Sequence, residues 1–247
     1  MATWIKARVV GKQLWTPRLV SLRFDADIAP FKAGQFLRCG MDLDGERVGR
    51  PYSLINTPDE RPFEIYFNIV ANGQLSPRLG ALEAGDDFWV YDTTHGFLVL
   101  DEVPEATGLW LLSTGTGIGP FISMLKTAAL WQRFEHVVLV HAVRHANELV
   151  YSEVINDTLT THAAQFRFVP FVSREQVADA IHGRIPAAIS EGTLEQAAGL
   201  SLSAERSHVM LCGNSGMITE ASSVLAERGM IKHRRSAPGH VTTEKYY

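Results

Sequence analysis

The segment from Ser113 to Pro120, STGTGIGP, has the residue types of a phosphate-binding turn. Gly115, Gly117 and Pro120 form a G-x-G-x-x-P pattern between an apolar run and a helix-like segment. Glycines let backbone N–H groups approach a phosphate, and a helix N-terminus favours an anion there. A tight strand-to-helix turn with no ligand is the other interpretation of a lone glycine-rich turn. The surrounding strand–helix–strand pattern favours phosphate binding.

Arginines follow the next two apolar runs. An NAD site of the Rossmann kind has an acidic residue near the end of its second strand, whereas an arginine accommodates a 2′-phosphate. Here that run ends at Arg144, the next is followed by Ser173 and Arg174, and HGRIP supplies Arg184. Taken alone, each of these arginines is more simply interpreted as a solvated surface residue. However, arginines follow two successive strands, and a guanidinium group can bind a phosphate through two parallel hydrogen bonds. We therefore predict NADPH over NADH.

Two further groups could do chemistry. Cys212, in LCGNSGM, either is a small buried hydrophobe or flanks a nicotinamide ring, and the sequence identifies no base that would make it a nucleophile. RPYSL places Arg50, Tyr52 and Ser53 on one strand, with Ser53 on the face opposite the other two. It combines an arginine for a phosphate, an aromatic plate and a hydroxyl, although a plain surface strand would also accommodate it.

The composition is that of a globular protein with a core, because 46% of the 247 residues are hydrophobic and 20% are charged. A net charge of −4 does not suggest a nucleic-acid binder. Cys39 and Cys212, the only cysteines, suggest neither a disulfide framework nor a zinc site. With no signal peptide and no apolar run near the roughly 20 residues of a membrane span, we expect a cytoplasmic protein.

The elements that position these groups fall into two halves. Residues 3–95 read as short strands, among them 19–24, 35–41 and 63–70, with a helix starting near Ser76 as N-cap; this is typical of an antiparallel barrel or sandwich. From residue 101, apolar runs at 109–114, 137–144, 166–173 and 208–214 alternate with helical segments at 118–131, 148–163, 184–198 and 217–228. That alternation predicts a parallel sheet in an α/β domain, with a domain boundary between residues 100 and 101.

RPYSL, GQLSPRL, STGTGIGPF, LCGNSGM and the terminal EKYY occur in the order seen in the ferredoxin–NADP reductase family, and the chain most resembles its bacterial type. The resemblance spans essentially the whole chain. It implies an antiparallel FAD-binding β-barrel (1–100) followed by a parallel-sheet NADP-binding α/β domain (101–247) whose tail returns to the flavin. It also implies hydride exchange between NADPH and FAD, and one-electron transfer to a ferredoxin or flavodoxin.

The resemblance further implies roles for individual residues. Ser53 and Glu244 would tune flavin N5 and the proton supply, and Cys212 would line the nicotinamide pocket. The FAD residues would be Arg50, Pro51, Tyr52, Ser53, Tyr66, Phe67, Asn68, Ile69, Gln74, Leu75, Ser76, Thr116, Tyr246 and Tyr247. The NADP residues would be Val143, Arg144, Ser173, Arg174, Arg184, Asn214 and Met217. No metal site is implied.

Two departures from the family pattern concern the FAD site. Gln74 stands where relatives often carry a basic residue, and the chain ends in Tyr247 where relatives can carry tryptophan. We expect Tyr246 near the isoalloxazine and Tyr247 toward the adenine. A tyrosine on the nicotinamide's docking face must move for hydride transfer, which would make the tail a gate.

The protein partner is predicted only in outline. Acidic carriers would dock on a locally basic surface, and IKHRR (231–235) is the densest basic cluster in the sequence. An equally good interpretation of this segment is a solvated basic run at the end of a helix. The same domains could serve a free-flavin or ferric-chelate reductase, an oxygenase reductase subunit, or a non-catalytic electron-transfer subunit. The chain has no cysteine set for an appended [2Fe–2S] cluster, and we expect a monomer.

Overall fold

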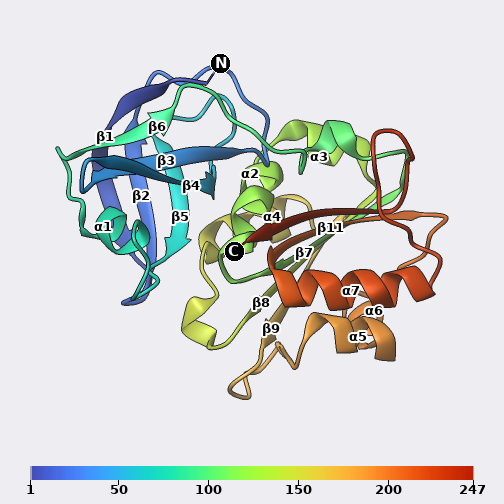
Figure 1. Cartoon of the computed structure of the whole chain (residues 1–247). Coiled ribbons are helices and arrows are strands. Elements are labelled where there is room, and N and C mark those ends of the chain that lie inside the picture. The colour runs from blue at the N-terminus through green and yellow to red at the C-terminus, as the bar shows by residue number, and fades with distance from the viewer. Residues whose placement is uncertain (1, 247) are drawn as a thin grey trace.

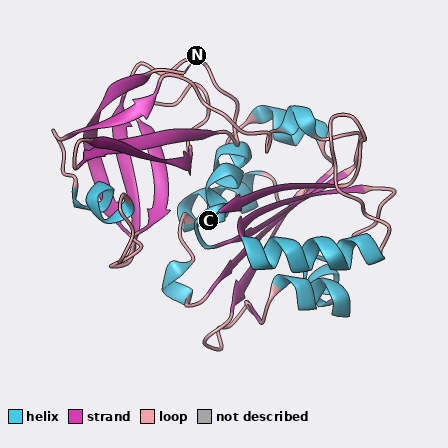
Figure 2. Ribbon diagram, in the orientation of Figure 1, coloured by secondary structure: helices cyan, strands magenta, loops and turns pink. Residues whose placement is uncertain are grey.

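The first half of the chain forms one antiparallel sheet (Figures 1 and 2) in the computed structural model, which describes residues 2–246. Alternate residues of its strands, such as Leu22, Phe24, Phe63 and Phe88, are fully or almost fully buried in the core that the curled sheet encloses. The outer strands of the sheet meet at an isolated bridge, Leu54–Ile65, so the sheet approaches a barrel without a continuous closing ladder among the described strands. In spatial order the strands are β4 (Glu46–Ser53), β3 (Phe36–Leu43), β6 (Asp87–Tyr91), β1 (Trp4–Leu14), β2 (Leu19–Asp25) and β5 (Phe63–Asn68).

The second half forms a parallel sheet, as predicted. Its central strands are near-continuous apolar runs because both faces are covered: Leu109 and Leu111 pack on one side, Trp110 and Leu112 on the other. In spatial order the strands are β10 (Ile181–His182), β9 (Phe166–Val172), β8 (His136–Val143), β7 (Gly108–Thr114), β11 (Ser207–Asn214) and β12 (Val241–Tyr246). The predicted combination of an antiparallel barrel-like half and a parallel α/β half is therefore confirmed.

Helices cover both faces of this sheet. The face toward the first half is covered by α2, α3 and α4, whose core also contains Leu19, Ile55 and Tyr66 of the first half, and the opposite face is covered by α5, α6 and α7 (Figure 1). The shared core joins the halves. The helices are α1 (Ser76–Ala81), α2 (Gly119–Leu125), α3 (Ala128–Arg133), α4 (Ser152–Thr161), α5 (Ile185–Glu191), α6 (Thr193–Ala198) and α7 (Ser215–Glu227), with short 3₁₀ turns η1 (Leu100–Glu102), η2 (Gly115–Ile118) and η3 (Ala146–Glu148).

Three predicted helices differ in extent from the observed ones. The segment 118–131 breaks between α2 and α3, where the Thr127 hydroxyl donates to the Met124 carbonyl (2.7 Å) and its backbone is extended. The segment 148–163 begins late, because Tyr151 adopts a left-handed conformation (φ 59°) before α4. Gly192 (φ 77°) divides 184–198 into α5 and α6, and this conformation suits glycine.

Helix α1 also starts differently from the prediction. Ser76 is its first residue and Leu75 its cap position, and the Ser76 hydroxyl accepts a hydrogen bond from the backbone N–H of Val70 (3.0 Å). The serine therefore fixes the preceding loop instead of capping the helix. Among residues 2–246, no helix is both long and apolar enough to cross a membrane.

The C-terminal segment is a strand and not a loose tail. Residues Val241–Tyr246 form β12, which pairs in parallel with β11 so that Glu244 stands opposite Cys212 and Tyr246 opposite Asn214. Its ladder to β11 carries the end of the chain back toward the antiparallel half (Figure 1). Tyr247, which the sequence assigns to FAD, lies outside the described residues.

Candidate functional site

A cleft of about 960 Å³ lies at the carboxyl ends of the parallel strands, where the two halves of the chain meet. In open α/β sheets this edge is where ligands bind. The predicted residues that line it come from both halves: Asn68, Thr116, Val143, Arg144, Ser173, Arg174, Arg184, Asn214, Met217 and Tyr246. The structure therefore brings together the seven residues predicted for NADP and three of those predicted for FAD.

The glycine-rich turn lies at the centre of this cleft, at the end of β7. A side chain at Gly117 would place its Cβ 2.4 Å from the carbonyl oxygen of Cys212, so the close contact between η2 and β11 requires glycine. Gly213 is equally constrained, with φ 126° and space for a Cβ occupied by the Thr114 hydroxyl. That hydroxyl accepts a hydrogen bond from the backbone N–H of Asn214 (2.8 Å), which locks the ends of β7 and β11 together.

A buried histidine hydrogen-bonds to the backbone of the glycine-rich turn. His141, on β8, is fully buried, and its Nε2 is 3.0 Å from the Gly115 carbonyl oxygen. Burial lowers the pKa of His141 to about 4, so the ring is neutral near pH 7 and its Nε2–H donates to that carbonyl. The sequence analysis missed this residue, although a histidine inside the apolar run VVLVHAVR was the available signal.

The three predicted arginines line one end of the cleft. Arg144 follows β8, Arg174 follows β9, and Arg184 precedes α5; all three are exposed. Among residues 2–246, no carboxylate forms an ion pair with these guanidinium groups. The Glu148 carboxylate instead accepts the backbone N–H of Arg144 (2.9 Å) and so holds the loop that follows β8. The arginines are available for an anionic ligand.

The three residues predicted to act where flavin and nicotinamide meet, Ser53, Cys212 and Glu244, gather at β12, to which Glu244 itself belongs. The Ser53 and Tyr246 hydroxyls are 2.5 Å apart, although 193 positions separate them in sequence, and the Tyr246 ring packs against the core cluster that contains Cys212. Glu244 lies against Gly96, where an added Cβ would be 3.2 Å from its Oε2. Serine, thiol, carboxyl and phenol therefore meet where β12 faces the antiparallel half.

Burial determines the protonation of these groups. It raises the pKa of Glu244 to about 7, and the carboxyl Oε1 is buried with no hydrogen-bond partner among the described residues. Burial first, and the neighbouring Glu244 charge second, raise the pKa of the Cys212 thiol well above its ordinary value. Cys212 is therefore a neutral thiol near pH 7 and has no thiolate for nucleophilic attack.

The antiparallel half presents the remaining predicted residues. Arg50 is exposed near the end of β4, Tyr52 is partly buried with its ring 5.4 Å from that of Phe67, and Ser53 is buried. Pro51 and Gln74 are exposed, Tyr66, Phe67, Leu75 and Ser76 are buried, and Ile69 packs partly against the core. The Leu75 side chain belongs to that core, so only its backbone is available to a ligand.

The basic cluster at 231–235 is less free than its sequence suggests. The Arg235 guanidinium forms a two-pronged ion pair with Glu102 (Nε to Oε2, 2.9 Å) and lies 4.3 Å from the centre of the Phe97 ring. Part of its charge is therefore matched within the molecule. Arg234, Lys232 and Ile231 remain exposed beside it.

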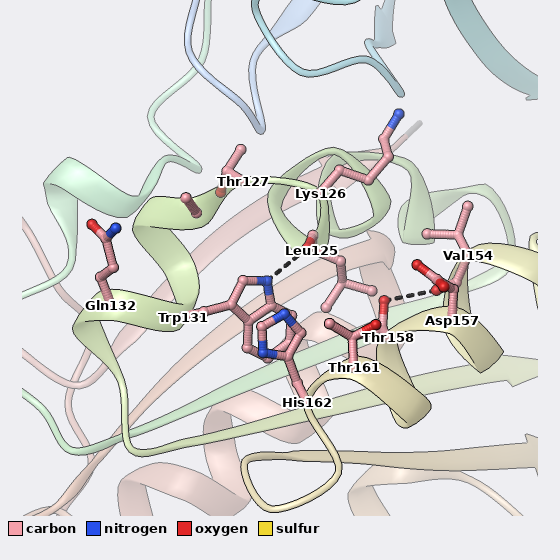
Figure 3. A pocket seen from close by; sticks show the side chains of 11 residues that line it. Leu125, Lys126, Thr127, Trp131, Gln132, Val154, Asp157, Thr158, Thr161 and His162 are labelled. Atoms are coloured by element: carbon pink, nitrogen blue, oxygen red, sulfur yellow. Dashed lines mark hydrogen bonds between the residues drawn. The ribbon is translucent and has the colours of Figure 1, made fainter.

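A second cavity of about 440 Å³ lies between α2, α3 and α4, away from the cleft (Figure 3). Its wall includes Trp131, whose ring stacks on His162 at 3.8 Å and whose Nε1–H donates to the Leu125 carbonyl (2.9 Å). None of the predicted site residues lines it. Among residues 2–246, no cluster of histidine, cysteine and acidic side chains could hold a metal ion, there or elsewhere.

Comparisons with known proteins agree with this geometry. Residues 111–223 match the family model of the oxidoreductase NAD-binding domain. The chain is 46% identical to the flavodoxin/ferredoxin–NADP reductase of Escherichia coli over 100% of both chains, and 32% identical to the ferredoxin–NADP reductase of Pseudomonas aeruginosa over 100% of this chain and 99% of that one. A crystal structure of a ferredoxin–NADP⁺ reductase from Neisseria gonorrhoeae with bound FAD and NADP superposes with a TM-score of 0.94, at 28% identity and 100% coverage of both chains.

Proposed function

The chain belongs to the flavodoxin/ferredoxin–NADP reductase family, and from this premise we propose that it transfers electrons between NADPH and a ferredoxin or flavodoxin through a bound FAD. The observation that supports this most directly is the gathering of Ser53, Cys212 and Glu244 around Tyr246. Tyr246 lines the same cleft as three arginines that form no ion pair with any carboxylate among residues 2–246. Such an arrangement suits a site for a dinucleotide whose reactive end meets a second redox group.

The proposed division of labour follows the two halves. Residues 1–100 would bind FAD and residues 101–247 would bind NADPH. The antiparallel half fits the flavin nucleotide, because Arg50 is exposed for a pyrophosphate and Tyr52 is a partly buried aromatic residue on the same strand. From the other half, Glu244 contributes a buried Oε1 that lacks a partner within the described chain. When bound, FAD accepts a hydride from the nicotinamide and releases electrons singly.

The protein's own residues would orient the reactants and hold the proton. Ser53 would donate a hydrogen bond at the reacting edge of the flavin, and Glu244, with its pKa raised to about 7, would hold a proton near neutral pH. The neutral Cys212 thiol would pack against the nicotinamide. Because the Tyr246 hydroxyl occupies the position beside both Ser53 and Cys212, we propose that this ring is displaced when the nicotinamide enters.

Arg144, Arg174 and Arg184 would bind the 2′-phosphate, with Ser173 beside them. The Ser173 hydroxyl donates to the Val143 carbonyl (3.2 Å), which holds the ends of β8 and β9 together under the arginines. Because parallel strands end at one edge of the sheet, Arg144 and Arg174 reach the same cleft as Arg184, which precedes α5.

The protein partner would be an acidic one-electron carrier, which fits a basic docking surface at Lys232 and Arg234. We also propose that the protein acts as a monomer in the cytoplasm. This is compatible with its two cysteines, which are buried free thiols. The cleft is built from one chain and needs no second subunit to complete it.

The decisive experiment combines the visible spectrum of the purified protein with its stopped-flow reduction by NADPH and NADH, followed by electron transfer to ferredoxin and flavodoxin. We expect a yellow protein that NADPH reduces much faster than NADH and that then reduces the carrier. A protein that reduces free flavin or ferric chelates but no protein carrier would support the alternative reductases. A colourless protein that reduces no dye would contradict the proposal and indicate a non-catalytic binding subunit.

A further inference from the structure

The turn between β1 and β2 extends into the cleft from the antiparallel half. Its backbone is fixed: the Thr16 hydroxyl accepts the N–H groups of Arg18 (3.2 Å) and Leu19 (3.1 Å), and the Trp15 N–H donates to the Leu19 carbonyl (2.9 Å). The Arg18 carbonyl accepts the N–H of Ile69 (2.7 Å), directly after β5. The position from which the Arg18 side chain projects is therefore well determined.

The same turn is fastened to the α/β half. Leu19 and Trp15 pack in the core that contains Ile118 of the glycine-rich turn. The Trp15 Nε1–H donates to the Ser21 hydroxyl (2.9 Å), which in turn is 2.7 Å from the buried Tyr151 hydroxyl of the α/β half. The Trp15 and Tyr151 rings also lie 5.0 Å apart. The turn is thus held at a fixed position relative to the phosphate-binding end of β7.

The Arg18 side chain forms no ion pair within the part of the chain that the structure describes. The residue is exposed, it lines the cleft together with Thr116 and Arg144, and no carboxylate among residues 2–246 forms an ion pair with it. The cleft contains four arginines against two glutamates, Glu148 and Glu220, and Glu148 is already engaged by backbone N–H groups. The excess positive charge is contributed by both halves of the chain.

We infer that Arg18 binds the pyrophosphate of the nicotinamide dinucleotide, so that the site proposed above for NADPH is completed by the antiparallel half. The three other arginines gather at the ends of β8 and β9 and before α5, where the proposed function places the 2′-phosphate. The glycine-rich turn GTGIGP offers backbone N–H groups but no cationic side chain to the pyrophosphate. Arg18, whose neighbour Leu19 packs in one core with Ile118 of that turn, supplies the missing cation, and a guanidinium can hold two phosphate oxygens at once.

The test compares two ligands on the FAD-loaded protein by isothermal titration calorimetry. NADP⁺ carries both the pyrophosphate and the 2′-phosphate, whereas adenosine 2′-monophosphate carries only the latter. Arg18→Ala is expected to weaken the binding of NADP⁺ about three- to tenfold, which is the range for a charge-assisted contact at a solvent-exposed site. The affinity for adenosine 2′-monophosphate should stay unchanged within error. Arg18→Lys should recover part of the NADP⁺ affinity.

Arg8→Ala is the matched control, because Arg8 is an exposed arginine of the same half that pairs with Asp87 outside the cleft. It should leave both affinities at the wild-type value. The inference is overturned if Arg18→Ala leaves NADP⁺ binding unchanged, if it weakens both ligands equally, or if Arg8→Ala has the same effect. A wild-type protein that binds neither ligand would instead overturn the proposed function, and the inference with it.

Discussion

Replacing Glu244 by glutamine should change how stability depends on pH. Burial raises the pKa of this carboxyl from an ordinary 4.5 to about 7 in the folded protein. Between these two values the folded state keeps the proton while the unfolded state releases it, so the unfolding free energy of the wild type falls as pH rises. Glutamine has a similar shape and no titration, so Glu244→Gln removes this fall.

The magnitude follows from the two pKa values. Their difference, at about 1.4 kcal/mol per pKa unit, corresponds to roughly 3 kcal/mol, and the partial exposure of Glu244 reduces this to about 2 to 3 kcal/mol. The wild type and Glu244→Gln should therefore be nearly equally stable below about pH 4.5. The variant should become more stable than the wild type by that amount as pH rises above 7.

Urea unfolding at a series of pH values from 4 to 8.5 measures this difference directly. Glu227→Gln is a suitable control, because Glu227 is an exposed carboxylate at the end of α7, and its substitution should change stability by less than about 0.5 kcal/mol at every pH. A stability difference between Glu244→Gln and the wild type that stays constant across the range would refute the argument, since it would mean that the carboxyl titrates alike in both states.

Three further substitutions test the site and its supports. Ser53→Ala should slow reduction by NADPH at least tenfold, on the order of one lost hydrogen bond to the reacting edge, while FAD stays bound; stopped-flow reduction and the visible spectrum measure both, and near-wild-type reduction would remove Ser53 from the mechanism. The double variant Arg144→Ala, Arg174→Ala should lose most of the preference for NADPH, seen as the ratio of kcat/KM for the two nucleotides, and an unchanged ratio would place the 2′-phosphate elsewhere. Tyr151→Phe should lower the free energy of unfolding, measured in urea, by about 1 to 3 kcal/mol, because the Tyr151 hydroxyl donates to Glu64 (2.7 Å) inside the interface between the halves. A variant as stable as the wild type would show that this hydrogen bond is dispensable.

The elements that the sequence predicted well are those with a local cause. The runs 109–114, 137–144, 166–173 and 208–214 became β7, β8, β9 and β11 because strands buried on both faces need apolar residues at every position. The helices were predicted too long because their breaks depend on single residues, the Thr127 hydroxyl and the left-handed Tyr151, that a 3.6-residue pattern does not register. Propensity and periodicity describe how a segment packs on average, and not where one hydrogen bond ends it.

Residues that meet only through the tertiary fold were predicted from motifs or not at all. The network of Trp15, Ser21, Glu64 and Tyr151 joins four positions spread over 137 residues of sequence, none of which belongs to a recognisable motif. His141 was missed for a related reason, since its role depends on a carbonyl 26 positions away. By contrast, Arg144 and Arg174 were predicted because parallel topology alone brings the ends of successive strands to one edge.

The pairing of β12 with β11 decides which side chains of the terminal EKYY can reach the site. Side chains alternate along a strand, so Glu244 and Tyr246 share one face while Lys245 occupies the other. The structure follows this rule: Tyr246 packs against the core shared by the two halves and bonds Ser53, whereas the Lys245 ammonium points to the Thr219 hydroxyl of α7 (3.4 Å). A register shifted by one residue would turn Lys245 toward Ser53 and remove the carboxyl and the phenol together. The two groups proposed to hold a proton and to guard the nicotinamide position are therefore placed by a single structural feature, the parallel ladder that begins at Val241.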